Sequence, residues 1–228
     1  WFWLILEPAL QAGTYYFLLV VVMRMADGDS TFLFFLISLI YWRSHSSLVT
    51  SAPGFLISKG HQYIEQGLGL SSALIEFLLS EVVMFISRFF ILCIFMLFLG
   101  YDPGYTWIVA LLISIVMFSF SFCISIYASL LGVYFRDFSR IFGHIVWLWW
   151  YLSPGLYRVE SLPEWAQLIL AANPFTYILP VAHSALLKNE FRSDLLFSNF
   201  IILIISILLI AIGLRYIFKM GYKLSKYV

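Results

Sequence analysis

The chain has 228 residues, of which 63% are hydrophobic, 20% are aromatic and 11% are charged, and its net charge is +1. Charged residues make up about a quarter of a typical soluble domain, so this composition, with a mean hydropathy of +0.97, excludes an ordinary soluble protein and indicates a polytopic membrane protein. We expect no nucleic-acid partner for such a chain.

Six apolar segments are long enough to cross a bilayer, which requires about 20 mostly apolar residues in a helix. Runs of this length without alternation are not typical of barrel strands, and lipid requires internally satisfied backbones. We therefore predict an all-α integral membrane protein, a single domain over residues 1–228 with six transmembrane helices. The predicted spans are residues 2–23, 32–49, 73–99, 105–133, 141–157 and 196–218.

Lysine and arginine residues indicate the orientation of these spans, because cytoplasmic loops are enriched in them. In a six-span arrangement one side collects the basic C-terminal tail and the loops after the second and fourth spans. We therefore predict a multi-pass protein with both termini in the cytoplasm. The basic residues on that side are Lys59, Arg136, Arg140, Arg215, Lys219, Lys223 and Lys226.

Charged residues also occur inside the predicted spans, where they are functional candidates by default. Glu7 in the first span is expected near the cytoplasmic interface. In the third span, Glu81 and Arg88 are seven positions apart and so share one helix face, about 10 Å apart along the axis. They could line a watery interior surface, or each could have a polar partner on a neighbouring helix.

Two connections on the predicted cytoplasmic side carry polar residues. Residues 50–70 form a long loop whose polar middle, residues 60–66, could be a short surface helix or a plain solvated connection. The turn at Arg136 and Asp137 separates two apolar segments, so it should lie at the membrane surface. There it could cap and anchor the adjoining helices or contact a partner.

The fifth span and the segment after it have distinct patterns. Trp147, Trp150 and Tyr151 fall on one helical face, and such an aromatic wall suits the C–H faces of sugar rings, although an interfacial aromatic belt is the alternative. Beyond it, residues 163–172 and 175–187 predict two half-length helices broken at Asn173-Pro174, because the residue before proline avoids helical geometry. Two such helices predict a re-entrant hairpin between the fifth and sixth spans, or an interfacial loop.

The order of these motifs resembles a known family. The chain contains GVYFRDFSR, then an apolar run, SPGLY, LPEW and NPFTYIL, and this order is similar to that in type-2 ABC permeases of capsule, O-antigen and teichoic-acid export. The resemblance implies a permease that moves a lipid-linked polysaccharide across the bacterial inner membrane. It further implies a homodimer, two copies of a P-loop ATPase that holds ATP and Mg, and an amphipathic interfacial helix before residue 1.

These patterns and the resemblance together suggest three groups of functional residues. Coupling to the ATPase is assigned to Gly60, His61, Gln62, Tyr63, Glu65, Arg136 and Asp137. The substrate channel is assigned to Trp147, Trp150, Tyr151, Glu81 and Arg88. The external gate is assigned to Ser153, Pro154, Pro163, Asn173 and Pro174.

Several motifs are absent from the sequence. It contains no P-loop, no His-Glu-x-x-His or Cys-x-x-Cys motif and no Gly-x-Ser-x-Gly elbow. We therefore expect no catalytic residue, metal or cofactor in this chain. Cys93 and Cys123 both lie inside apolar runs, so we predict that they are free thiols. The alternatives are a type-2 permease for a drug, lipid or small molecule, an integral-membrane glycan-modifying enzyme, and an ion-coupled transporter.

Overall fold

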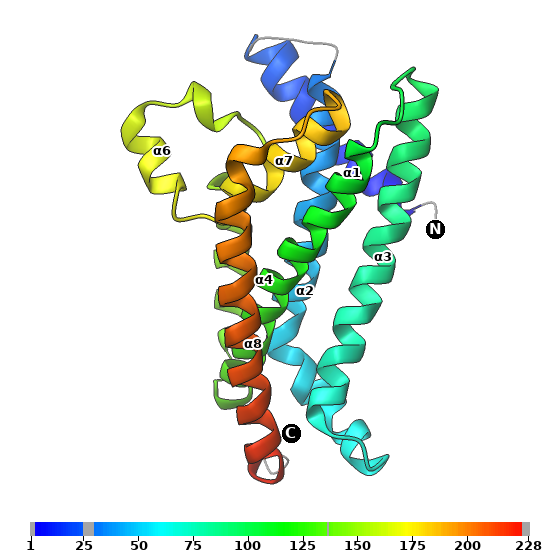
Figure 1. Ribbon diagram of the computed structural model, residues 1–228. Helices are drawn as coiled ribbons and strands as arrows, with labels where there is room; N and C mark the ends of the chain where they lie inside the picture. Colours follow the sequence, from blue (N-terminus) through cyan, green and yellow to red (C-terminus); the bar gives the residue numbers. More distant parts are fainter. Residues whose placement is uncertain (1–2, 25–29, 136, 225–228) are drawn as a thin grey trace.

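The computed structural model describes residues 3–24, 30–135 and 137–224, and no β-strand occurs in these ranges (Figure 1). Cys93 and Cys123 are free thiols, as predicted. The main helices are α1 (Trp3–Tyr16), which continues as a π-helix over Phe17–Val22, α2 (Thr31–Glu65), α3 (Leu70–Phe98), α4 (Thr106–Tyr134), α5 (Phe138–Tyr151), α6 (Glu164–Leu170), α7 (Phe175–Leu187) and α8 (Leu196–Leu224).

Four helical segments are long and apolar enough to cross a membrane: α2, α3, α4 and Ser193–Lys219, which includes most of α8. A fifth candidate arises if α6 and α7, which are bent by 100° at Asn173-Pro174, count as one span. The first and fifth predicted spans are shorter than expected. The apolar helix near the start covers Leu6–Val22, and α5 has 14 residues because the Ser153-Pro154-Gly155 turn follows its end.

The expected loop over residues 50–70 is wrong, because α2 continues without interruption to Glu65. Pro53 lies inside the helix and removes a single backbone donor. The helix ends where Gly67 adopts a φ of 73° and the N–H of Leu68 donates to the carbonyl of Tyr63, a glycine C-cap of the Schellman type. At 35 residues, α2 is about 52 Å long, so it extends well beyond a bilayer core of about 30 Å.

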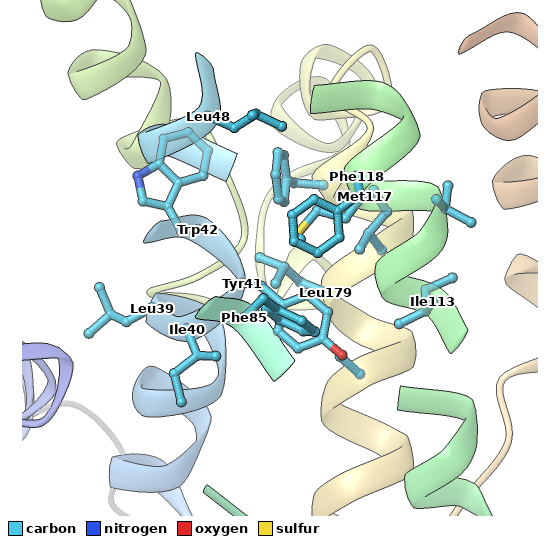
Figure 2. Close-up of a cluster of buried hydrophobic side chains, with 14 of the residues drawn as sticks. Leu39, Ile40, Tyr41, Trp42, Leu48, Phe85, Ile113, Met117, Phe118 and Leu179 are labelled. Atoms are coloured by element: carbon cyan, nitrogen blue, oxygen red, sulfur yellow. The ribbon is translucent and has the colours of Figure 1, made fainter. Parts of the chain in front are cut away.

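The core is organised around α2 and α4, which pack closely along their length. Small residues on α4 permit this approach: Ser125 donates to the carbonyl of Leu48 at 3.1 Å, and a Cβ on Gly132 would lie 2.0 Å from the carbonyl oxygen of Pro53. Figure 2 shows side chains from α2, α3, α4 and α7 meeting here, with Tyr41 and Phe85 among the largest fully buried ones.

The helices define two ends of the bundle (Figure 1). The connection between α2 and α3 lies at the same end as the C-terminal end of α8, and we call this the α2–α3 end. The start of α2, the α6–α7 pair and the start of α8 lie at the opposite end, which we call the α7 end.

Candidate functional site

A cluster of charged and polar side chains joins α1, α2 and α3 within the bundle. Arg43 forms an ion pair with Glu7, with 2.6 Å between Nη2 and Oε1. Arg88 donates to the hydroxyl of Ser44 at 2.8 Å. Arg43 lies 12 residues into α2, about 18 Å along its axis, so Glu7 has an ion-pair partner within that helix. Its expected place near the cytoplasmic interface stays a prediction.

The prediction that Glu81 and Arg88 share a helix face is confirmed. Their exposed fractions are 6% and 8%, and both face α2, where Ser47 donates to Glu81 at 2.7 Å. Each therefore has a polar partner on the neighbouring helix, which is one of the two outcomes that the sequence left open. Whether they also contact a substrate stays a prediction.

Five of the seven residues assigned to coupling lie on the last two turns of α2 rather than in a loop. Gly60 to Glu65 all belong to this helix, and Tyr63 hydrogen bonds to Glu76 near the start of α3. Beside this contact is a cavity of about 290 Å³ whose polar lining includes Lys59, Gln62 and Ser80.

Asp137 is the N-cap residue of α5, but its side chain makes no capping hydrogen bond, so the helix-cap alternative is not supported for this residue. Arg136 lies outside the described residues. The coupling role of this turn stays a prediction.

The aromatic residues of α5 do not form one wall. Trp147 and Tyr151 are 59% and 45% exposed and pack edge to face with 5.4 Å between ring centroids. Trp150 is 3% exposed and donates its indole N–H to Tyr15 at 2.9 Å. Trp150 therefore does not belong to the exposed surface that carries Trp147 and Tyr151, because its ring packs against Tyr15 and Trp42. That these aromatic residues line a channel stays a prediction.

Four of the five residues assigned to the external gate lie in two segments that contact each other, the turn after α5 and the break between α6 and α7. The side-chain amide of Asn173 donates to the carbonyl of Leu152 at 2.7 Å and to Ser153 at 3.0 Å, and its oxygen accepts the N–H of Phe175 at 3.1 Å. One buried asparagine thus joins the turn after α5 to the break between α6 and α7. Pro163 and Pro174 are the N-cap residues of α6 and α7, and Pro154 lines a cavity at the α7 end.

A buried histidine that the sequence interpretation did not single out lies at the meeting point of four helices. His45 is fully buried, and its Nδ1 is hydrogen bonded to Ser121 of α4 at 2.8 Å. Aromatic rings from α2, α4, α5 and α7 surround it; they belong to Trp42, Phe120, Trp149 and Phe175. The position of His45 inside the predicted span 32–49 was the available signal, but it does not reveal which helices converge on it.

The glycan-modifying enzyme that the sequence left as an alternative has no support in this arrangement. Such an enzyme would need paired carboxylates, but Glu76 and Glu81, the two carboxylates of the predicted span 73–99, have separate partners, Tyr63 and Ser47. Within the described ranges, no group of three or more histidine, cysteine, aspartate or glutamate side chains could hold a metal ion.

Comparison with known proteins identifies three similar chains. Two "O-antigen export system permease protein RfbA" sequences from Klebsiella pneumoniae are 28% and 26% identical over 230 aligned positions, which cover 98% of this chain and 85% of each relative. A protein of the same name from Myxococcus xanthus is 26% identical over 78% of this chain and 68% of its own length. No protein-family profile matches the chain. The resemblance inferred from its motifs is confirmed: over nearly its whole length, the chain is similar to the permease proteins of O-antigen export systems.

Proposed function

We propose that this chain is the membrane-spanning permease subunit of an ABC exporter that moves a lipid-linked polysaccharide from the cytoplasm across the bacterial inner membrane. The observation that carries this proposal is the similarity to O-antigen export permeases over 98% of the chain. The helical architecture with several long apolar helices supports it. Because the sequence has no P-loop, ATP and Mg would be bound by a separate ATPase subunit.

In this proposal the protein crosses the membrane six times, with α1, α2, α3, α4, α5 and α8 as spans and both termini in the cytoplasm. The α2–α3 end would then be cytoplasmic and the α7 end external. The basic residues of the C-terminal tail, Lys59 near the end of α2, and Arg136 and Arg140 around the start of α5 support this orientation. The relatively short α1 and α5 would cross where neighbouring subunits and thinned lipid reduce the length required.

The α6–α7 pair would form a re-entrant hairpin that gates the external exit. Helices of 7 and 13 residues are about 10 and 20 Å long, so neither can cross the core alone. Both lie at the end of the bundle where α8 begins (Figure 1). Asn173 is hydrogen bonded to the turn after α5, so a movement of α5 would also move the α6–α7 hairpin.

Coupling would occur at the α2–α3 end, where α2 extends beyond the bilayer. Gln62 and Glu65 are exposed on its last turns, and Asp137 is exposed at the start of α5. These side chains would contact the ATPase, and movement of the ATPase would shift the ends of α2 and α5. Two permease subunits and two ATPase subunits would complete the exporter.

The polysaccharide would pass between two copies of the permease, each supplying half of the channel. The exposed Trp147 and Tyr151 of α5 would face this path and pack against sugar rings, while Trp150 would hold α5 against α1 and α2. Glu81 and Arg88, which are hydrogen bonded to α2, would keep the neighbouring helices in register.

Purification of the tagged full-length protein from its native membrane in mild detergent tests the proposal. We expect a P-loop ATPase to co-purify in equal amount, and we expect ATP hydrolysis by the complex to respond to the lipid-linked polysaccharide of the same cell. A monodisperse, folded preparation that contains no ATPase would contradict the proposal and favour an ion-coupled transporter.

A further inference from the structure

A cavity of about 340 Å³ lies at the α7 end of the bundle. It is bounded by the start of α2, the chain that follows α5, and the end of α7. Its lining is of two kinds. Phe34, Pro154 and Pro180 supply apolar walls, whereas a group of charged side chains lies among them.

The charged side chains of this lining are mainly cationic. The lining contains three cationic side chains and one carboxylate, which belong to Arg158, Lys188, Arg192 and Glu160. Two further carboxylates, Asp27 and Asp29, precede the lining residue Ser30 in the sequence and lie outside the described residues.

The three cations differ in their partners. Arg192 is already paired, with Asp194 at 2.8 Å and with Glu160 at 3.5 Å, and hydrogen bonding to Asp194 raises the pKa of Arg192 above its ordinary value. Arg158 and Lys188 form no ion pair within the described part of the chain. Two positive charges of the cavity are therefore available to a ligand.

The apolar wall beside these cations is held in place by stacked rings. The guanidinium of Arg158 lies 6.0 Å from the centroid of the Phe34 ring, within the range of a cation–π contact. Phe34 in turn stacks on His183 with 3.9 Å between centroids, and His183 is hydrogen bonded to Ser38 at 2.8 Å. The site thus offers a fixed apolar surface with positive charge at its edge.

We infer that this cavity binds the phosphate group of an amphiphilic molecule, with Arg158 and Lys188 as the residues that hold it. Arginine and lysine are the usual partners of phosphate oxygens. The cavity lies where apolar helices begin and end, the level at which lipid headgroups lie in a membrane. An adjoining apolar wall suits the hydrocarbon of a lipid better than it suits free inorganic phosphate. The inference requires neither an ATPase nor transport, so it can fail or succeed independently of the proposed function.

Calorimetric titration of the full chain in phosphatidylcholine nanodiscs tests this inference. Dihexanoyl phosphatidic acid is the anionic probe, and dihexanoyl phosphatidylcholine is the probe with the same tails and no net charge. We expect the first to bind and the second to show no saturable binding. Inorganic phosphate as competitor identifies the source: displacement at concentrations similar to those of the lipid assigns the site to free phosphate, and displacement only at far higher concentrations assigns it to a lipid.

The double variant Arg158→Gln/Lys188→Gln should weaken binding of the anionic probe by about tenfold or more, because two charge-assisted hydrogen bonds are lost. Arg24→Gln is the matched control: it removes one cation close to α2 in sequence, but Arg24 does not line the cavity. Unchanged binding by the double variant would overturn the inference, and so would an equal loss in Arg24→Gln, which would indicate non-specific surface attraction.

Glu160→Gln provides a test in the opposite direction. Removing the carboxylate of the lining should strengthen binding roughly threefold, in keeping with the small energy of an exposed charge pair. A purely structural role for Arg158 and Lys188 does not predict this gain, so unchanged or weaker binding in Glu160→Gln would contradict the inference. This variant also decides the question if the double variant does not fold.

Discussion

Helices α2 and α8 are both long apolar helices, yet they have opposite surroundings. In their most apolar 18-residue windows, 78% of residues are buried in α2 and 11% in the segment that contains α8. The buried helix α2 is the less apolar of the two, since it contains Ser38, Ser44 and His45. These side chains need polar partners that lipid does not offer, so they favour the centre of the bundle. In this protein, polar side chains rather than apolarity distinguish the helix at the centre from the one at the periphery.

Substitution of Gly132 by alanine should produce the largest effect, because it acts where α2 and α4 touch. The added Cβ would lie 2.0 Å from the carbonyl oxygen of Pro53, and rigid backbone cannot yield as a side chain can. We expect a loss of about 3 kcal/mol in stability, measured as a lower unfolding temperature in detergent.

Two other glycines make this test specific. In Gly213→Ala of α8, the nearest atom, at 2.6 Å, is the methyl Cγ2 of Ile126, so we expect a smaller loss. In Gly143→Ala of α5 the added Cβ meets nothing within 4 Å. Because alanine favours a helix more than glycine does, this variant should leave the unfolding temperature unchanged or slightly raised. Equal effects at all three positions would mean that the α2–α4 contact has no special importance.

The Arg88→Gln variant tests whether buried charges hold α3 against α2. Loss of the guanidinium removes the hydrogen bond to Ser44 and a compensating charge near Glu81, and it should cost about 2 kcal/mol of stability. Arg215→Gln, an equal change on an exposed face of α8, is the control. If both variants unfold at the wild-type temperature, Arg88 has no structural role.

Charge reversal at Asp137 tests the proposed coupling surface. Asp137→Lys should reduce substrate-stimulated ATP hydrolysis of the complex roughly fivefold, as expected for about 1 kcal/mol of lost coupling, while expression and thermal stability stay near wild type. Asp102→Lys, at an exposed position of the α3–α4 connection, should leave hydrolysis unchanged. Equal hydrolysis in both variants would exclude Asp137 from coupling.

The smallest effect is expected at the exposed aromatic face of α5. Trp147→Ala should lower export about twofold, since one stacking contact with sugar contributes on the order of 0.5 kcal/mol. Trp165→Ala, which removes an exposed tryptophan of α6, should have less effect. Trp150→Ala should instead lower thermal stability, because it empties a buried position. Wild-type export by Trp147→Ala would remove the aromatic face from the transport path.

Long apolar runs and proline breaks could be located from the sequence. The predicted spans 73–99 and 105–133 agree closely with Leu70–Phe98 and Thr106–Tyr134, and the break at Asn173-Pro174 separates α6 from α7 as predicted. Local chemistry is sufficient in these cases, since apolarity and the backbone restriction of proline act over a few residues.

Other features depend on contacts between distant segments. The continuation of α2 past residue 50 has no local signal, because polar residues are as compatible with a helix end outside the bilayer as with a loop. The burial of Trp150 depends on Tyr15 and Trp42, which are more than 100 positions away. The hydrogen bonds between Asn173 and the turn after α5 likewise form only when the chain is folded.

The contact of Gly132 with Pro53 divides α2 into two unequal arms. From Pro53, the helix extends 22 residues back to Thr31 and 12 residues on to Glu65, which correspond to about 33 and 18 Å. Both parts belong to one continuous helix, which joins the contact of Tyr63 with Glu76 to the cavity that Phe34 lines. A displacement at one end of α2 would therefore reach the other end without an intervening loop.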